Sequence, residues 1–355
     1  MTRRLPGLLL IAGILALTLP TTGCSAGRSA APPVTPGAPR DPGTVLPVIF
    51  DDDGSQDGTA ALAFLLSHPG VSVRAITISY GEAHPDVYVQ HVARKLDNMG
   101  VEGIPLGAGR DAPLAGSNAF PDWLRERSNN FGGLPIPNAD QTYPVQDAAE
   151  LIVATVNASP EPITLFISGA QTNLAEALRR NGDIAANIAA VYIMGGAVYV
   201  PGNIQGLTPD SDNEVAEWNV YADPQAAKEV LASELPLYLV PLDATNQVTL
   251  NAEDIQRWRE GGPTADFAVE IYERALENFG GSNAAVWDLM TAAVMLDPSL
   301  CRFASLPLDV ITAEGATSGQ TVVVEGGTAN VTVCLAPDAG RIKENFRQVF
   351  SAAAP

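Results

Sequence analysis

Four aspartates in one short segment are the residues of this chain best suited to chemistry. Asp51, Asp52 and Asp53 directly follow an apolar run, and Asp57 comes four residues later. Ionised carboxylates at this density repel one another unless a cation or hydrogen-bond donors offset their charge. A hard divalent cation such as calcium or magnesium prefers oxygen ligands of this kind. The other interpretation is a solvated acidic turn in which Asp57 or Ser55 caps the next helix.

An apolar strand must position this turn, and from residue 45 onward apolar strands alternate with helical segments. The predicted strands are Val45–Phe50, Val71–Ser79, Ile163–Ser168, Ala190–Met194 and Leu235–Pro241. The predicted helices are Thr59–Ser67, Asp86–Met99, Val145–Val156, Asn173–Arg180 and Pro224–Ala232. Continuous apolar strands in this order predict an α/β fold, a Rossmann-like and mainly parallel sheet flanked by helices.

The segment 303–335 differs, because short strands and glycine turns replace the long alternation. It predicts a small antiparallel addition near the C-terminus. In a mainly parallel sheet, ligands bind beyond the carboxyl ends of the strands. The aspartates follow the first strand, so they fall at that edge.

Two enzyme patterns fit the acidic segment locally. Asp51-x-Asp53 after an apolar strand resembles the opening of haloacid-dehalogenase-type phosphatases, with Asp51 as nucleophile and Asp53 as acid/base. That family also needs a downstream lysine followed by a Gly-Asp motif that holds magnesium. The three lysines, Lys95, Lys228 and Lys343, do not precede such a motif at the end of an apolar strand. The phosphatase interpretation therefore extends no further than its first motif.

The second pattern continues along almost the whole domain. The segment Asp51–Gly58 resembles the Asp-x-Asp-Pro-Gly-x-Asp-Asp opening of the inosine-uridine-preferring nucleoside hydrolase family. Further segments similar to that family follow in its order: Ala75–Gly81, Gly169–Ala175, Met194–Gly196, Gly202–Asn203, Ala216–Pro224, Leu242–Thr245 and Trp287–Asp288. Each segment is a weak signal alone, but their order over roughly 250 residues favours this family and its fold.

The resemblance implies hydrolysis of the ribose–base N-glycosidic bond of a ribonucleoside, through an oxocarbenium-like transition state. It implies calcium as the cofactor, with Asp53 as both a ligand and the general base. The implied metal ligands are Asp53, the Thr172 carbonyl and Asp288. The implied substrate-binding residues are Asp57, Glu82, Met194, Asn203, Glu217, Asn219 and Trp287.

Three of these positions depart from the family pattern. Gly58 stands where the family has its second adjacent aspartate, a metal ligand, and either Glu82 or Asp52 is a candidate to restore that carboxylate. On this hypothesis Glu82→Gln weakens calcium binding strongly. Glu82 itself replaces the usual asparagine, and Trp287 replaces the usual histidine. Trp287 cannot donate a proton but is able to stack on a base, and a surface or structural role is the favoured interpretation of His84.

Gly58 and Trp287 keep a second class of function open, a lipoprotein that binds a nucleoside or ribose on the same fold without cleaving it. The loop 111–142 adds Phe120, Trp123 and Phe131 as candidates to stack on the base. The pattern leaves purine or pyrimidine preference and homo-oligomerisation undecided.

The composition of the chain limits the classes of partner that it is expected to bind. The hydrophobic share of 46% and the charged share of 17% exclude disorder along the whole chain. A formal net charge of -20 disfavours binding to nucleic acids and anionic lipid head groups. The small-molecule nucleoside that the family resemblance implies therefore remains the expected partner.

The first 24 residues predict export. Arg3 and Arg4 precede the apolar run Leu8–Leu19, which is too short to span a bilayer but suits a signal peptide. Thr21–Cys24 then resembles the lipobox of bacterial lipoproteins, which predicts a lipid anchor at Cys24 outside the cytoplasmic membrane. An ordinary signal peptide with an incidental cysteine is the alternative.

Residues 25–43 are rich in Ala, Pro and Gly and predict a tether, and residues 44–355 form the predicted nucleoside hydrolase-like domain. The two cysteines of that domain are Cys301 and Cys334. In an oxidising compartment they are able to pair, and two buried thiols are the alternative.

Overall fold

The computed structural model describes residues 33–34, 45–259 and 261–352. The predicted signal peptide lies outside them, and of the predicted tether only Pro33–Val34 is described, as a two-residue strand. Within these ranges, no helix combines the length and hydropathy needed to cross a bilayer.

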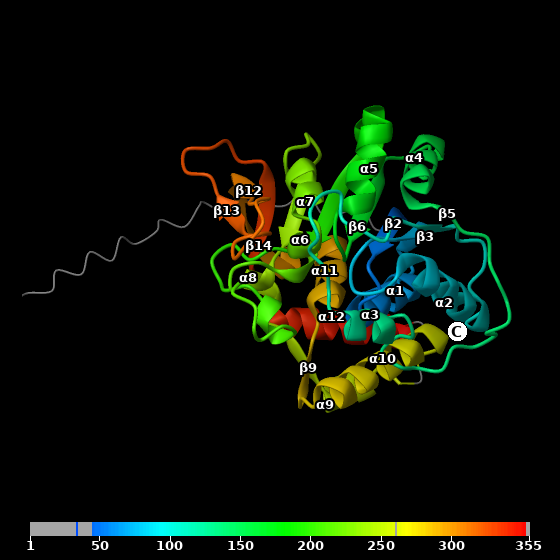
Figure 1. Ribbon diagram of the computed structural model, residues 1–355. Coiled ribbons are helices and arrows are strands. Elements are labelled where there is room, and N and C mark those ends of the chain that lie inside the picture. The colour runs from blue at the N-terminus through cyan, green and yellow to red at the C-terminus, as the bar shows by residue number, and fades with distance from the viewer. Residues whose placement is uncertain (1–32, 35–44, 260, 353–355) are drawn as a thin grey trace, which may run out of the picture. The chain divides into compact units, whose positions relative to one another are not determined.

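A ten-stranded sheet forms the centre of the fold (Figure 1). In spatial order its strands are β1 (Pro33–Val34), β11 (Cys301–Leu306), β14 (Val331–Pro337), β8 (Leu237–Val240), β7 (Ile188–Met194), β6 (Ile163–Ile167), β2 (Leu46–Asp52), β3 (Val71–Ile78), β4 (Leu106–Ala108) and β5 (Gln146–Asp147). All neighbours from β14 to β5 pair in parallel. The predicted Rossmann-like, mainly parallel sheet is therefore confirmed.

The antiparallel addition near the C-terminus is also present, although it divides differently from the prediction. Strand β11 runs antiparallel to β14 and to β1, whereas β14 itself joins the parallel part through β8. Strands β12 (Leu308–Val310) and β13 (Thr321–Val323) form a separate pair, as do β9 (Thr249–Asn251) and β10 (Asn283–Ala285). Cys301 and Cys334 form a disulfide between β11 and β14, with their Cα atoms 5.8 Å apart.

Helices cover both faces of the sheet, which explains the long apolar runs in its central strands. The helices are α1 (Gln56–Ser67), α2 (Pro85–Asn98), α3 (Asp122–Ser128), α4 (Ala148–Ala158), α5 (Thr172–Arg180), α6 (Trp218–Ala222), α7 (Pro224–Leu231), α8 (Leu242–Thr245), α9 (Ala252–Gln256), α10 (Pro263–Phe279), α11 (Trp287–Leu296) and α12 (Ala339–Ala352). One large hydrophobic core includes α1, α2, α10, α11 and α12, and a second includes α4, α5 and α7.

Strand β2 extends further than the sequence predicted, and this changes where the aspartates lie. It continues through Asp51 and Asp52 because their backbone groups still pair with β3. Side chains alternate along a strand: Phe50 belongs to the core containing α1, and Ile49 to the core containing α4 and α5. Asp51 therefore faces α5, and Asp52 faces α1. Helix α1 begins at Gln56, earlier than predicted.

Candidate active site

Four neighbouring parallel strands, β3, β2, β6 and β7, bring their carboxyl ends to one edge of the sheet. Asp53 follows β2, Glu82 follows β3, Ser168 follows β6, and Met194 is the last residue of β7. These four residues line a cavity of about 410 Å³. Polar side chains from distant parts of the sequence thus meet where parallel sheets commonly bind ligands.

Nearly all of the predicted site residues line this cavity. They are Asp53, Asp57, Glu82, Met194, Asn203, Glu217, Asn219, Trp287 and Asp288. Thr172 does not: it is fully buried at the start of α5, where its hydroxyl donates to Asp223 Oδ2 at 2.8 Å. The geometry brings the predicted residues together, while the role of each one stays a prediction.

Asp53 occupies a narrow space between two glycines. Ideal Cβ atoms on Gly81 and Gly169 would each lie 2.5 Å from Asp53 Cβ, so only glycine leaves room there. The Glu82 N–H donates to Asp53 Oδ2 at 3.1 Å, whereas the buried Oδ1 has no hydrogen-bond partner. Burial, together with the charges of Asp52 and Glu82, raises the pKa of Asp53 well above its usual range.

Asp57 and Asp288 join α1 to the start of α11. Asp57 accepts hydrogen bonds from the Tyr272 hydroxyl and the Asp288 N–H. Ser55 donates to Asp288 Oδ2 at 2.8 Å, and the buried Asp288 Oδ1 has no partner. Burial raises the pKa of Asp57 to about 7. Burial and the charges of Asp57, Asp52 and Asp53 raise the pKa of Asp288 well above its usual range.

The chemistry of these carboxylates fits a hard cation. Asp53 Oδ1 and Asp288 Oδ1 are buried acceptors without donors, in a cluster whose members raise one another's pKa. An ion would satisfy both oxygens and offset the repulsion. In the described part of the chain, no three acidic, histidine or cysteine side chains are already drawn together around one ion position.

The lysines lie elsewhere. Each pairs with a carboxylate outside the cluster: Lys95 with Glu270 at 3.2 Å, Lys228 with Asp309 at 2.5 Å and Lys343 with Asp254 at 2.8 Å. A phosphatase of the haloacid-dehalogenase type needs a lysine beside its aspartates. The phosphatase interpretation is therefore wrong for this site.

A second wall of the cavity is fixed by backbone contacts around α6. Glu217 caps that helix, and its Oε2 accepts the Gly196 N–H at 2.9 Å. Asn219 Nδ2 donates to the Met194 carbonyl at 3.1 Å. The Trp218 N–H donates to Asn203 Oδ1, also at 3.1 Å. These contacts hold polar groups at the cavity in fixed orientations.

Aromatic side chains form the apolar part of the cavity. Phe120 and Trp218 stack with ring centroids 4.4 Å apart and planes 22° apart, and Trp287 is partly exposed to the cavity. Of the other two stacking candidates, Trp123 is 51% exposed and Phe131 is packed among core aromatics, and neither lines the cavity.

The sequence analysis missed two contributors. Trp218 lies within the recognised segment Ala216–Pro224, and its position between Glu217 and Asn219 was a usable signal. Tyr272 is 215 residues from Asp57, the carboxylate that it contacts, and no local pattern marks it. His84 contacts Asn129 and does not line the cavity, which agrees with a structural role.

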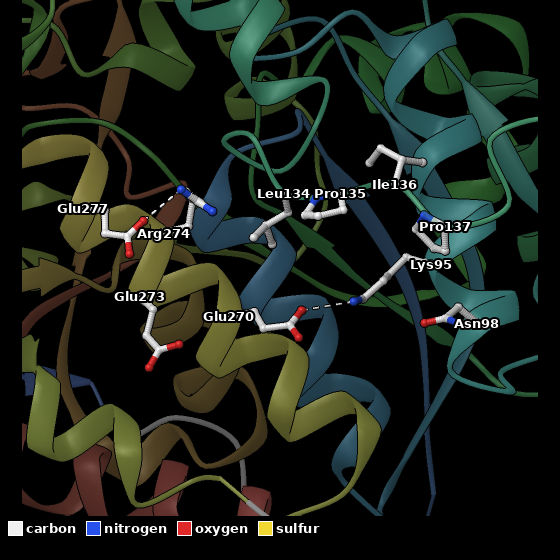
Figure 2. A pocket seen from close by; sticks show the side chains of 10 residues that line it. All are labelled: Lys95, Asn98, Leu134, Pro135, Ile136, Pro137, Glu270, Glu273, Arg274 and Glu277. Carbon is white, nitrogen blue, oxygen red and sulfur yellow. Dashed lines mark hydrogen bonds and ion pairs between the residues drawn. The ribbon is translucent and has the colours of Figure 1, made fainter.

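A second cavity, of about 480 Å³, lies between α2, residues 134–137 and α10 (Figure 2). Its charged side chains largely neutralise one another: Lys95 pairs with Glu270, and Arg274 pairs with Glu277 at 2.8 Å. It contains none of the predicted site residues. The cavity at the strand ends is therefore the candidate active site.

Comparison with known proteins identifies relatives of this chain. The family described as inosine-uridine preferring nucleoside hydrolase matches residues 48–344. The pyrimidine-specific ribonucleoside hydrolase RihA of Citrobacter koseri is 34% identical over 302 residues, covering 82% of this chain and 93% of the relative. RihA of Escherichia coli O1:K1 / APEC is 32% identical over 306 residues, covering 82% and 94%.

Solved structures share the fold. The plant nucleoside hydrolase PpNRh1 superposes with a TM-score of 0.76 at 24% identity, covering 87% of this chain and 99% of that one. The purine-preferring ribonucleoside hydrolase from Gardnerella vaginalis superposes with a TM-score of 0.73 at 24% identity, with the same coverage.

Proposed function

The chain belongs to the inosine-uridine preferring nucleoside hydrolase family, and we propose that it is a calcium-dependent hydrolase with a preference for pyrimidine ribonucleosides. It is an N-glycosyl hydrolase, which cleaves the bond between ribose and base with water. The preference rests on the relatives that are 32–34% identical, which are named pyrimidine-specific and are covered over 93–94% of their length.

One observation supports the metal most directly: the unpartnered, buried oxygens of Asp53 and Asp288 at the same cavity. These two carboxylates would hold the ion, together with the Thr172 carbonyl that the family resemblance adds. Bound there, calcium would lower the pKa of a coordinated water and help to anchor ribose hydroxyls. All other steps fall to the side chains of the cavity.

Asp53 is the proposed general base. This carboxylate would hold the ion and accept a proton from the attacking water, and the Glu82 N–H holds its Oδ2 in place. The glycines at 81 and 169 restrict the movement of this carboxylate, so its orientation is set before substrate binds. General-base catalysis of this kind contributes roughly 10²–10⁴-fold to the rate.

The remaining polar residues orient the ribose, and the aromatic residues receive the base. Asp57, Asn203, Glu217 and Asn219 present acceptors and donors to the cavity from two of its walls. Trp218 and Trp287 present aromatic surface to the base. No histidine lines the cavity among the described residues, so we propose that stacking, rather than a histidine acid, assists the departing base.

We further propose that the protein acts outside the cytoplasmic membrane, anchored through lipid on Cys24. The segment 1–24 supports export, and the Cys301–Cys334 disulfide suits an oxidising compartment. In a bacterial host, the full chain should fractionate with membranes, and Cys24→Ala should release it. Equal membrane association of both forms would contradict the anchor.

The test of the activity uses the full chain in detergent with uridine, cytidine, inosine, guanosine and adenosine. Free ribose is measured with calcium, after chelation, and after calcium is restored. We expect uridine and cytidine to be cleaved on the order of tenfold faster than the purine nucleosides, and chelation to stop the reaction reversibly. Faster purine cleavage would contradict the base preference, and full activity in chelator would contradict the metal.

A further inference from the structure

The Asp52 side chain leaves no room for a side chain at position 58, which is glycine in this chain. An ideal Cβ on Gly58 would lie 1.9 Å from Asp52 Oδ1 and 2.9 Å from Asp52 Cγ, whereas ordinary contacts of a Cβ atom are 3.4–4 Å. The alternation along β2 directs Asp52 toward α1, the helix that carries Gly58. The Asp52 carboxylate therefore occupies the volume in which any side chain at position 58 would begin.

Asp52 also lies within electrostatic reach of the rest of the cluster. Its charge contributes to the raised pKa values of Asp53, Glu82 and Asp288. Asp52 itself is 1% exposed, lies at the end of β2 and does not line the cavity. No other acidic residue among those described combines this reach with the space above Gly58.

Neutral donors hold Asp52 in place. Ser168 Oγ donates to Oδ1 at 2.8 Å, and the Gly54 N–H donates to Oδ2 at 3.1 Å. A carboxylate has about four acceptor positions, so both oxygens keep capacity for a further partner. Because three or four neighbouring carboxylates repel one another, a cation is the partner best suited to the remaining acceptor positions.

We propose that Asp52 is a calcium ligand of this enzyme, supplying from the strand the carboxylate that the family pattern places at position 58 on the helix. The inference rests on the proposed calcium-dependent function. Gly58 is then a required part of the arrangement, because it leaves the space through which Asp52 reaches the ion. Since the cluster is not already drawn around one ion position among the described residues, its carboxylates would move toward the ion when it binds.

Glu82 is the competing candidate, and its surroundings are less suitable. Its Oε1 accepts from Ser128 at 2.8 Å, and it lies on the loop after β3 rather than in the space at position 58. The two candidates therefore differ in a measurable way: Asp52 is coupled sterically to Gly58, and Glu82 is not.

The experiment measures calcium affinity by titration calorimetry on the full chain, and calcium-induced thermal stabilisation as a second readout. We expect Asp52→Asn to weaken calcium binding on the order of 100-fold, because ligand charge tunes affinity strongly. We expect Glu82→Gln to stay within about fivefold of the wild type, as should the matched control Asp51→Asn, whose carboxylate faces Thr77 and Asn173 instead.

A carboxylate swap tests the coupling. Asp52→Ser should bind calcium as weakly as Asp52→Asn, and adding Gly58→Asp to it should restore affinity to within about tenfold of the wild type. Gly58→Asp alone should lower the melting temperature through the clash with Asp52. Melting curves without calcium identify any variant that fails to fold.

Each result has a defined meaning. Wild-type affinity in Asp52→Asn, or no gain from adding Gly58→Asp to Asp52→Ser, would overturn the role of Asp52. Strong weakening only in Glu82→Gln would assign the ligand to Glu82. A wild-type chain that binds no calcium would overturn the proposed metal dependence itself, and with it this inference.

Discussion

Gly81→Ala should disable the enzyme by moving one carboxylate. The added Cβ would lie 2.2 Å from Asp53 Oδ2, 2.5 Å from Asp53 Cβ and 2.7 Å from Asp53 Cγ. All three nearest atoms belong to Asp53, and because one of them is its Cβ, relief requires the Asp53 backbone to shift as well as its carboxylate. Relief to an ordinary contact of 3.4 Å requires Asp53 to move by about 1 Å.

A displacement of about 1 Å is large enough to lower the rate of the chemical step. Misplacement of a reacting group by about 1 Å can cost on the order of 100-fold in rate. That factor corresponds to about 2.7 kcal/mol in activation free energy. Because the hydrogen bond from the Glu82 N–H would also be strained, we expect kcat to fall and KM to change less.

The assay is steady-state ribose release from uridine, with the melting temperature measured in parallel. Gly182→Ala is the matched control, because nothing lies within 4 Å of its added Cβ and it is remote from the cavity. The control should keep wild-type kcat. A Gly81→Ala enzyme within about threefold of the wild-type kcat would refute the argument that Asp53 is held in place by the lack of a side chain at position 81.

Two further outcomes follow from the structure. The Cys301–Cys334 disulfide closes a segment with a sequence separation of 33, so removing it by Cys301→Ala with Cys334→Ala should lower the free energy of unfolding by about 3–4 kcal/mol in denaturant titrations. A reductant should then have no further effect on that variant, and an unchanged unfolding midpoint would contradict the estimate. His84→Ala should keep kcat within about twofold over the whole pH range, because His84 contacts Asn129 and not the cavity. A tenfold loss would instead indicate an acid role for His84.

The sequence predicted the main parallel strands in their order, because these strands are buried on both faces and read as continuous apolar runs. It predicted no helix after residue 232, where the structure has α10, α11 and α12. It ended the first strand at Phe50, since aspartate is uncommon inside strands. In the structure, Asp51 is accommodated there by hydrogen bonds from Thr77 and Asn173. Such compensation comes from other elements and is invisible in a local pattern.

The cavity was predictable where motifs follow strand ends, and less so where contacts are distant. Asp53, Glu217 and Asp288 lie in recognisable segments, and the structure places them at one cavity. Tyr272 lies in no recognised segment, although it contacts Asp57. The relation between Asp52 and Gly58 was visible only in the three-dimensional structure. Whether Asp52 occupies the space of a side chain at position 58 depends on how the strand and the helix are placed against each other.

The contacts of Asp57 tie the pocket to the last stages of folding. Its partners Tyr272 and Asp288 lie 215 and 231 residues further along the chain. During synthesis, the acidic turn therefore emerges long before the residues that complete it. Loops of this length close slowly, so the pocket cannot form early as a local unit. An exported chain would thus stay without a finished nucleoside site until α10 and α11 have docked, and it would gain its activity only at the end of folding.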